Sequence, residues 1–140
     1  MSRAAVLSAL RSDTDLTNLV AADNILTNYS SEGRPSNLDP GAFIILRWEE
    51  ANQNLKNSSV SRTLTLWAHY PAERSTDYSR LDAIMLRAKE ILVDMEQVLG
   101  DDGYTVTCIE YNGESADLKD DAFNTISRNS TFKVLCRATA

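Results

Sequence analysis

The chain has 140 residues, of which 43% are hydrophobic, so it can bury the core of one domain but not of two. Its formal net charge of -6 disfavours a surface that binds nucleic acid by neutralising phosphates. No apolar run approaches the roughly 20 residues that span a bilayer, and charges interrupt the apolar N-terminal stretch before a signal-peptide core could form. We therefore expect a single soluble domain over residues 1–140, made in a reducing cytoplasm and without a membrane partner.

The first forty residues predict two short helical segments followed by a loop. Residues 3–10 are rich in alanine and place Val6, Leu7 and Leu10 on one side of a helix. Thr14 or Asp15 can cap a second short helical turn. The stretch 29–41 is rich in residues that favour turns, and we interpret it as an exposed loop.

The next segment predicts a β-hairpin with a long connection. Residues 42–48 form a short run of β-formers, and residues 60–70 alternate between apolar and polar side chains. The polar connector 49–59 is longer than most hairpin loops, and such a loop often binds a partner. The candidate partner-facing residues in it are Glu49, Glu50, Asn52, Asn54 and Lys56.

A long amphipathic helix is predicted over residues 77–99. Its apolar positions recur at steps of three and four: Tyr78, Leu81, Met85, Ala88, Leu92, Met95 and Leu99. Ser75 or Asp77 supplies an N-cap, and Gly100 stands where helices often stop. We expect this stripe to be the main local contribution to the core.

Two further strands complete the predicted fold. Residues 104–111 and 130–138 have β-type patterns, and Cys108 and Cys136 on them have no metal-binding or redox spacing, so we interpret both as small apolar residues. Strands, then a helix, then strands again predict an α+β fold. We expect an antiparallel sheet of about four strands, with the long helix packed on it and a short N-terminal helix.

No motif in the sequence predicts catalysis or a cofactor. His69 is the only histidine, and no Gly-x-Ser-x-Gly elbow accompanies it, so a hydrogen-bonded or solvent-facing side chain is expected. No glycine-rich motif could hold the phosphates of a nucleotide. We therefore expect a protein that is not an enzyme.

One acidic cluster leaves a different class of function open. It consists of Glu110, Glu114, Asp117, Asp120 and Asp121. A hard cation needs several oxygen ligands within one small loop, and this spacing does not match a calcium-binding loop. We interpret the cluster as a solvated or inter-subunit loop, with a small metal-dependent hydrolase using residues 110–121 as the alternative.

The C-terminal third of the chain resembles a known family. The acidic stretch 113–121, the segment Phe-Asn-Thr-Ile-Ser-Arg at 123–128 and the alternating strand 131–137 are similar to the C-terminal half of tail terminator proteins of long-tailed (siphovirus-type) bacteriophages. The resemblance implies a structural protein of the virion neck, with no catalytic residues and no cofactor. Such proteins form homohexameric rings that cap the tail tube protein, stop tube polymerisation and provide the docking surface for the head-tail connector protein.

The resemblance also supplies candidate contacts between subunits: Asp117, Leu118, Asp121, Phe123, Ile126 and Arg128. A ring needs two complementary patches rather than one self-matching patch. DNA would pass through the lumen without specific binding, because carboxylates there repel phosphates. A neighbouring role as a neck, head-completion or tail-completion protein remains the alternative within the same class.

Overall fold

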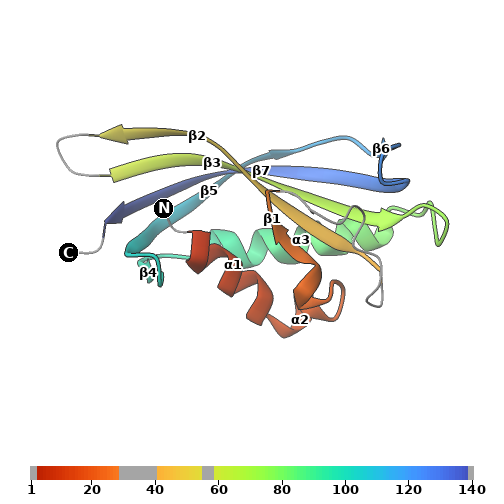
Figure 1. The fold of residues 1–140 in the computed structure, drawn as a ribbon, viewed down its shortest axis with the longest axis horizontal. Coiled ribbons are helices and arrows are strands. Elements are labelled where there is room, and N and C mark those ends of the chain that lie inside the picture. The colour runs from red at the N-terminus through yellow and green to blue at the C-terminus, as the bar shows by residue number, and fades with distance from the viewer. Residues whose placement is uncertain (1–2, 29–40, 55–58, 139–140) are drawn as a thin grey trace.

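The protein has a mixed α+β fold in two layers. The computed structural model describes residues 3–28, 41–54 and 59–138. Figure 1 shows the helices gathered on one face of a curled sheet, while no described helix covers the other face, which we call the open face. The helices are α1 (Arg3–Ser12), α2 (Thr14–Thr17) and α3 (Ser79–Val93), with a 3-10 turn at Ala22–Asn24. None of the described helices is long and apolar enough to cross a membrane.

The sheet has seven strands in the described part of the chain. They are β1 (Ile25–Thr27), β2 (Phe43–Asn54), β3 (Ser59–Pro71), β4 (Val98–Leu99), β5 (Tyr104–Glu114), β6 (Leu118–Asp120) and β7 (Thr125–Ala138). Their order is β1-β2-β3-β7-β5-β4, and β6 also pairs with β7. The predicted α+β class is confirmed, but the sheet has more strands than the four or so that the sequence predicts. The additional strands have two or three residues, too few to show an alternating pattern.

The N-terminal prediction is confirmed, with a different cap. The first helix forms as predicted and continues to Ser12. The second is capped by Asp13 rather than by Thr14 or Asp15, because an Asp13 oxygen accepts a hydrogen bond from the Leu16 backbone nitrogen at 2.9 Å. The predicted loop at 29–41 lies, except for its last residue, outside the described residues.

The polar connector between the two hairpin strands is shorter than predicted. Strand β2 runs on to Asn54 and β3 starts at Ser59, so Glu49, Glu50, Asn52 and Asn54 belong to a strand, whereas Lys56 lies outside the described residues. A β-bulge between Trp48 and Ala51 shifts the register. Figure 1 shows this end of the hairpin reaching beyond the helical layer. The sequence of this part of β2, from Glu49 to Asn54, is mainly polar.

The long helix ends earlier than predicted. Its apolar pattern continues to Leu99, but α3 ends at Val93, and Val98 and Leu99 pair with β5. Gln97 takes a left-handed conformation with φ 53°, and Gly100 is not the stop. Leu99 is 66% exposed, so the last position of the predicted apolar stripe lies outside the core.

The start of α3 follows the predicted capping chemistry in part. The N-cap position is Tyr78, which makes no side-chain cap. The Asp77 carboxylate nevertheless accepts hydrogen bonds from the Ser79 backbone nitrogen at 2.9 Å and from its hydroxyl at 2.7 Å. Asp77, one of the two residues predicted to cap the helix, therefore stabilises the first turn of α3.

The core lies between the helices and the sheet. The α3 residues that face the sheet are buried as predicted: Leu81, Ile84, Met85, Ala88 and Leu92. They meet the inward side of the long central strands, represented by Leu64, Leu66, Phe132 and Val134. Because successive strand residues point to opposite faces, the intervening residues of β3 and β7 lie on the open face.

Candidate functional site

The acidic C-terminal excursion is a folded extension of the sheet. After β5 ends at Glu114, three residues intervene before β6 pairs with the start of β7. The turn that follows is closed by a hydrogen bond from the Phe123 backbone nitrogen to an Asp120 carboxylate oxygen at 3.0 Å. Asn124 completes the turn in a left-handed conformation with φ 53°, which asparagine tolerates better than most residues. The excursion therefore presents its side chains in defined positions.

Arg128 is the residue that ties the excursion to the body of the protein. Its guanidinium contacts an Asp82 oxygen at 2.7 Å, a Glu114 oxygen at 2.9 Å and an Asp117 oxygen at 3.6 Å. It also donates to the Ser115 carbonyl at 3.0 Å. Asp82 lies on α3, whereas the other partners lie on or just after β5, so one side chain joins the helix, the excursion and β7.

The environment of Arg128 stabilises its charged form. Its side chain is only 17% exposed. Burial alone would lower the pKa of Arg128, but the hydrogen bond and charge of Asp82 and the charge of Glu114 outweigh it and raise that pKa. A guanidinium with several carboxylate partners suits such a position, because its planar fork binds them in defined directions.

The other predicted interface residues divide by exposure. Asp117 and Asp121 have side chains that are 60% and 93% exposed, and Leu118 is 36% exposed. Phe123 is half-buried and packs edge-on against the rings of Phe43 and His69. Ile126, at 3% exposed, packs within the core of this chain. The exposed members are free to meet a neighbour, and contact between subunits stays a prediction for the whole set.

Arg128 brings together residues that sequence reasoning did not connect. Asp82 stands 46 positions before it and Glu114 stands 14 before it. Tyr78 was also missed: its hydroxyl donates to the Leu118 carbonyl at 2.6 Å and attaches the excursion to the start of α3. No spacing signal in the sequence relates these residues, because their proximity depends on how α3 lies across the sheet.

The acidic cluster does not converge on one point. Glu114 and Asp117 turn towards Arg128, while Asp121 lies 3.8 Å from Lys119 on the surface. Within the described ranges, no group of three or more His, Cys, Asp or Glu side chains could hold a metal ion. The arrangement therefore offers a hard cation no set of converging ligands.

His69 lies in a small aromatic cluster on the open face. Its ring is 3% exposed, stacks on Phe43 with centroids 4.6 Å apart, and makes a 2.8 Å hydrogen bond between Nδ1 and the Thr125 hydroxyl. Of the two predicted environments, the hydrogen-bonded one is found. Burial lowers the pKa of His69 to about 4, against a weak opposing effect of the Asp120 charge. The ring is therefore neutral near pH 7.

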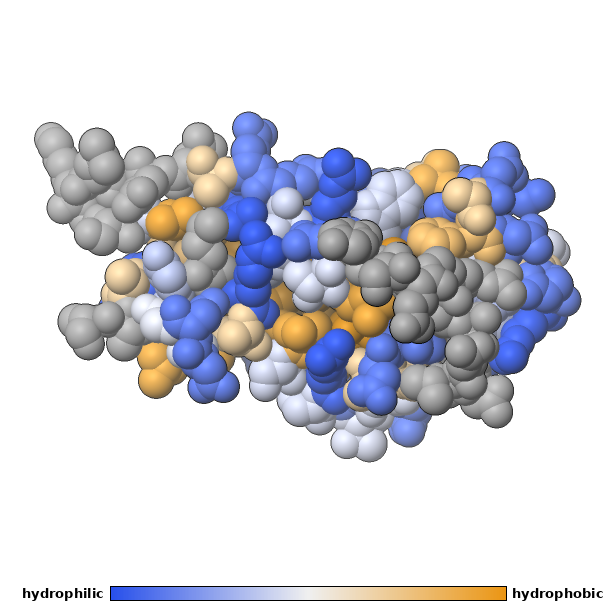
Figure 2. Space-filling model, viewed as in Figure 1, coloured by the Kyte–Doolittle hydropathy of each residue, from blue (hydrophilic) through white to orange (hydrophobic). Residues whose placement is uncertain are grey.

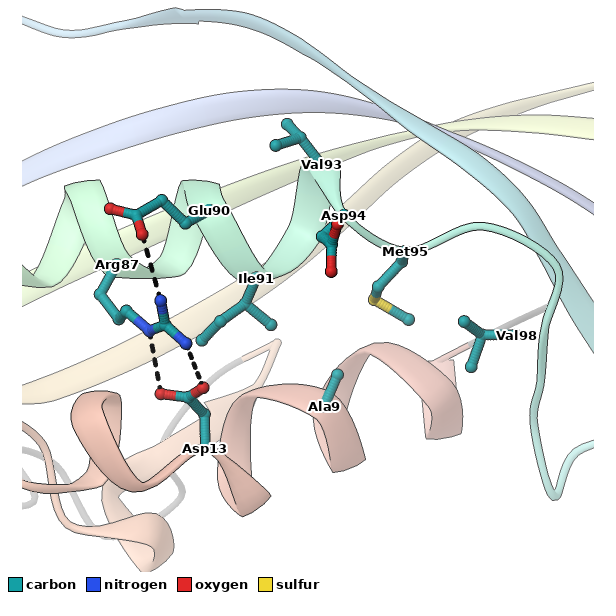
Figure 3. Close-up of a pocket in the computed structure, with 9 residues that line it drawn as sticks. All are labelled: Ala9, Asp13, Arg87, Glu90, Ile91, Val93, Asp94, Met95 and Val98. Carbon is teal, nitrogen blue, oxygen red and sulfur yellow. Dashed lines mark hydrogen bonds and ion pairs between the residues drawn. The ribbon is translucent and has the colours of Figure 1, made fainter.

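A groove runs between α1 and the C-terminal half of α3 (Figure 3). It has a volume of about 640 Å³, and its lining combines apolar side chains from Ala9, Ile91, Met95 and Val98 with charged ones. At one end, Arg87 pairs with Asp13 at 2.6 Å and with Glu90 at 3.1 Å. The hydrogen bonds from Arg87 and from the Leu16 backbone lower the pKa of Asp13 to about 2. This ion pair joins the start of α2 to α3 and closes one end of the groove.

Large apolar side chains are exposed at only a few described positions. They are Leu86, Val93, Leu99 and Leu118. Figure 2 shows the apolar side chains of one face scattered among hydrophilic ones. Val93 borders the groove, and Leu99 borders a smaller depression of about 190 Å³ that shares Ala9 and Val98 with it. The groove therefore combines exposed apolar surface with acidic side chains, as the excursion does around Leu118.

Comparison with known proteins identifies a similar fold. No protein-family model matches the chain, and no curated protein matches its sequence. The fold is similar to that of a chain from a solved structure described as the virion of a native gene transfer agent (GTA) particle. The TM-score is 0.70 and the sequence identity 11%, and the match covers 95% of this chain and 92% of that chain. At this identity the likeness establishes the two-layer α+β fold that the two chains share.

Proposed function

We propose that this protein is a structural component of a phage-like virion, and that within it the protein acts as a tail terminator. In this role, copies of the chain form a ring on the end of the finished tail tube, stop its polymerisation and present a docking surface to the head-tail connector. The protein performs no catalysis in this function. It works in the neck of the particle, and DNA passes through the ring.

The observation that carries the proposal is the fold shared with a chain of a gene transfer agent virion over 95% of the sequence. This likeness supports a role in a virion. The resemblance of residues 113–137 to tail terminators favours the tail terminator among the roles in a virion. The folded acidic excursion adds a physical argument. Because Arg128 and Tyr78 hold it in place, Asp117, Leu118 and Asp121 can meet a neighbouring subunit with little loss of conformational entropy.

The β2–β3 hairpin is the second part of the proposed assembly surface. Its far end extends beyond the helical layer, and Glu49 and Glu50 on it are exposed. A projecting arm of this kind can reach the tail tube or the connector without distorting the domain. We assign the contact with a virion partner to this arm, rather than to the long loop that the sequence suggested.

Two alternatives differ in their support. A head-completion or tail-completion protein of the neck would agree equally well with the likeness to a virion chain. In the described part of the chain a metal-dependent hydrolase has no geometric support, because Glu114 and Asp117 pair with Arg128, Asp120 accepts a hydrogen bond in its own turn and Asp121 lies beside Lys119.

The test is tube assembly in the presence of the purified full chain. Tail tube protein is allowed to polymerise with and without it, and the products are measured by negative-stain microscopy. A terminator gives tubes of narrow length distribution, each with a ring at one end. Tubes that grow equally long and uncapped, together with binding to the head connector alone, would assign the protein to head completion instead.

A further inference from the structure

The groove between α1 and α3 has the character of a docking site. We call the apolar lining residues Ala9, Ile91 and Val98 its floor, and the exposed lining residues its border, which includes Val93 at 41% exposed. Asp94 lies on the same border, and Asp101 lines the adjoining depression. An apolar floor with an acidic border suits a partner surface that carries an apolar residue between basic ones.

The open face of the same chain carries such a surface. Because Phe132, Val134 and Cys136 of β7 are buried towards the helices, Lys133, Leu135 and Arg137 point to the open face. We call these three the β7 stripe. Lys133 and Arg137 are exposed, and Leu135 is half-buried between its register neighbours Ser61 and Cys108. Glu110 is the register neighbour of Lys133, so the stripe and this neighbour together carry one net positive charge.

The groove and the stripe lie at the same end of the molecule, on opposite faces. Val98, in the groove, pairs with Val106, which in turn pairs with Cys136 in β7. The Arg137 guanidinium reaches to 3.3 Å from the Gln97 side chain, next to Val98. In Figure 1 this is the end where α1 and β4 lie beneath β5 and β7. A second copy whose open face lies on the helical face of the first can therefore place its stripe over the first copy's groove.

We propose that the α1–α3 groove of one copy binds the β7 stripe of the next, and that this contact is a part of the repeating interface of the ring, separate from the contact expected of the excursion. The inference rests on the proposed function, because it assumes that copies of the chain assemble. Two different surfaces on opposite faces make a head-to-tail contact, which closes into a ring when the rotation between copies allows it. Leu135 contacts the apolar floor, and Lys133 and Arg137 face Asp94 and Asp101 of the neighbour.

Charge reversal on each side gives the decisive test. Asp94→Lys changes the groove border, and it suits the C-terminal end of α3, where positive charge is favoured by the helix dipole. Arg137→Glu changes the stripe, and its register neighbours Ser59 and Thr105 carry no charge. Each variant should weaken self-association by at least about tenfold, because it places like charges together across the contact. Circular dichroism and thermal melting check that both variants fold.

The mixture of the two variants distinguishes this contact from others. In an equimolar mixture the two variants can alternate around the ring. Each reversed groove then meets a reversed stripe, and each native groove meets a native stripe. Every contact then joins opposite charges, so association should return to near the wild-type level, and native mass spectrometry should show rings with equal numbers of each variant. Asp23→Lys, an exposed charge reversal outside both surfaces, is the matched control and should assemble like the wild type.

The outcomes separate this inference from the proposed function. If the wild type forms rings and either single variant forms them equally well, the groove and stripe are not the interface, although the terminator function stands. If both variants fail and the mixture does not recover, each surface contacts something else, which also overturns the inference. If the wild type forms no ring even on tube ends, the proposed function itself fails.

Discussion

The environment of His69 predicts that the protein loses stability in mildly acidic solution. In the folded protein the ring is buried, and burial lowers its pKa to about 4. In the unfolded chain the pKa is about 6.5. Below pH 6.5 the unfolded state therefore binds a proton that the folded state excludes, so the free energy of unfolding falls as the pH falls from about 6.5 to about 4.

The size of the effect follows from the difference between the two pKa values. At roughly 1.4 kcal/mol per pKa unit, the complete loss is about 3 kcal/mol. At pH 5, where the folded ring is still neutral, about 2 kcal/mol of this is already lost. Asp13 does not interfere in this range: its pKa is lowered to about 2, so its contribution is lost only at more acidic pH, below the ordinary value of an aspartate.

Urea unfolding at about pH 7.5 and about pH 5 measures the prediction. Because His69 is the only histidine, the proton resonances of its ring also report its pKa directly by nuclear magnetic resonance. The control is His69→Gln, which can still bond to Thr125 but does not titrate, and its stability should change much less between the two pH values. A ring that titrates near 6.5 in the folded protein, or equal stability of the wild type at both pH values, would refute the reasoning.

Three further predictions concern the core, the Arg128 contacts and DNA. Met85→Asp should abolish soluble folded protein, because Met85 is 1% exposed and the new charge has no partner. Met85→Leu is the control, and near-native thermal melting of the Asp variant would contradict the packing of α3. Arg128→Ala should lower the free energy of unfolding by about 1 to 3 kcal/mol in urea denaturation, because Asp82 and Glu114 lose a shared partner, whereas an unchanged value would show that these contacts contribute nothing. With a net charge of -6, the chain should bind duplex DNA no more tightly than about 10⁻⁴ M at physiological salt, as measured by fluorescence anisotropy, and tight salt-sensitive binding would show the opposite.

Local patterns in the sequence determined the main elements and the inner side of α3. A helix with a repeat of three and four residues, or a strand with a repeat of two, shows which of its faces is buried, because side-chain direction follows from backbone geometry. For this reason Met85 and Leu92 were placed in the core, and the α+β class was predicted. The same rule failed at Leu99, where the apolar pattern continued but the backbone had already left the helix.

Tertiary structure decided the contacts on which assembly depends. The short strands β1, β4 and β6 exist because a long neighbour supplies their hydrogen-bond partners, and two or three residues cannot encode that pairing by themselves. Arg128 meets Asp82 only because α3 crosses the sheet at that point, and the groove forms where α1 and α3 lie side by side, with the ion pair between Arg87 and Asp13 at one end. These contacts join residues far apart in the chain, so they depend on how the two layers pack and not on the periodicity of any one segment.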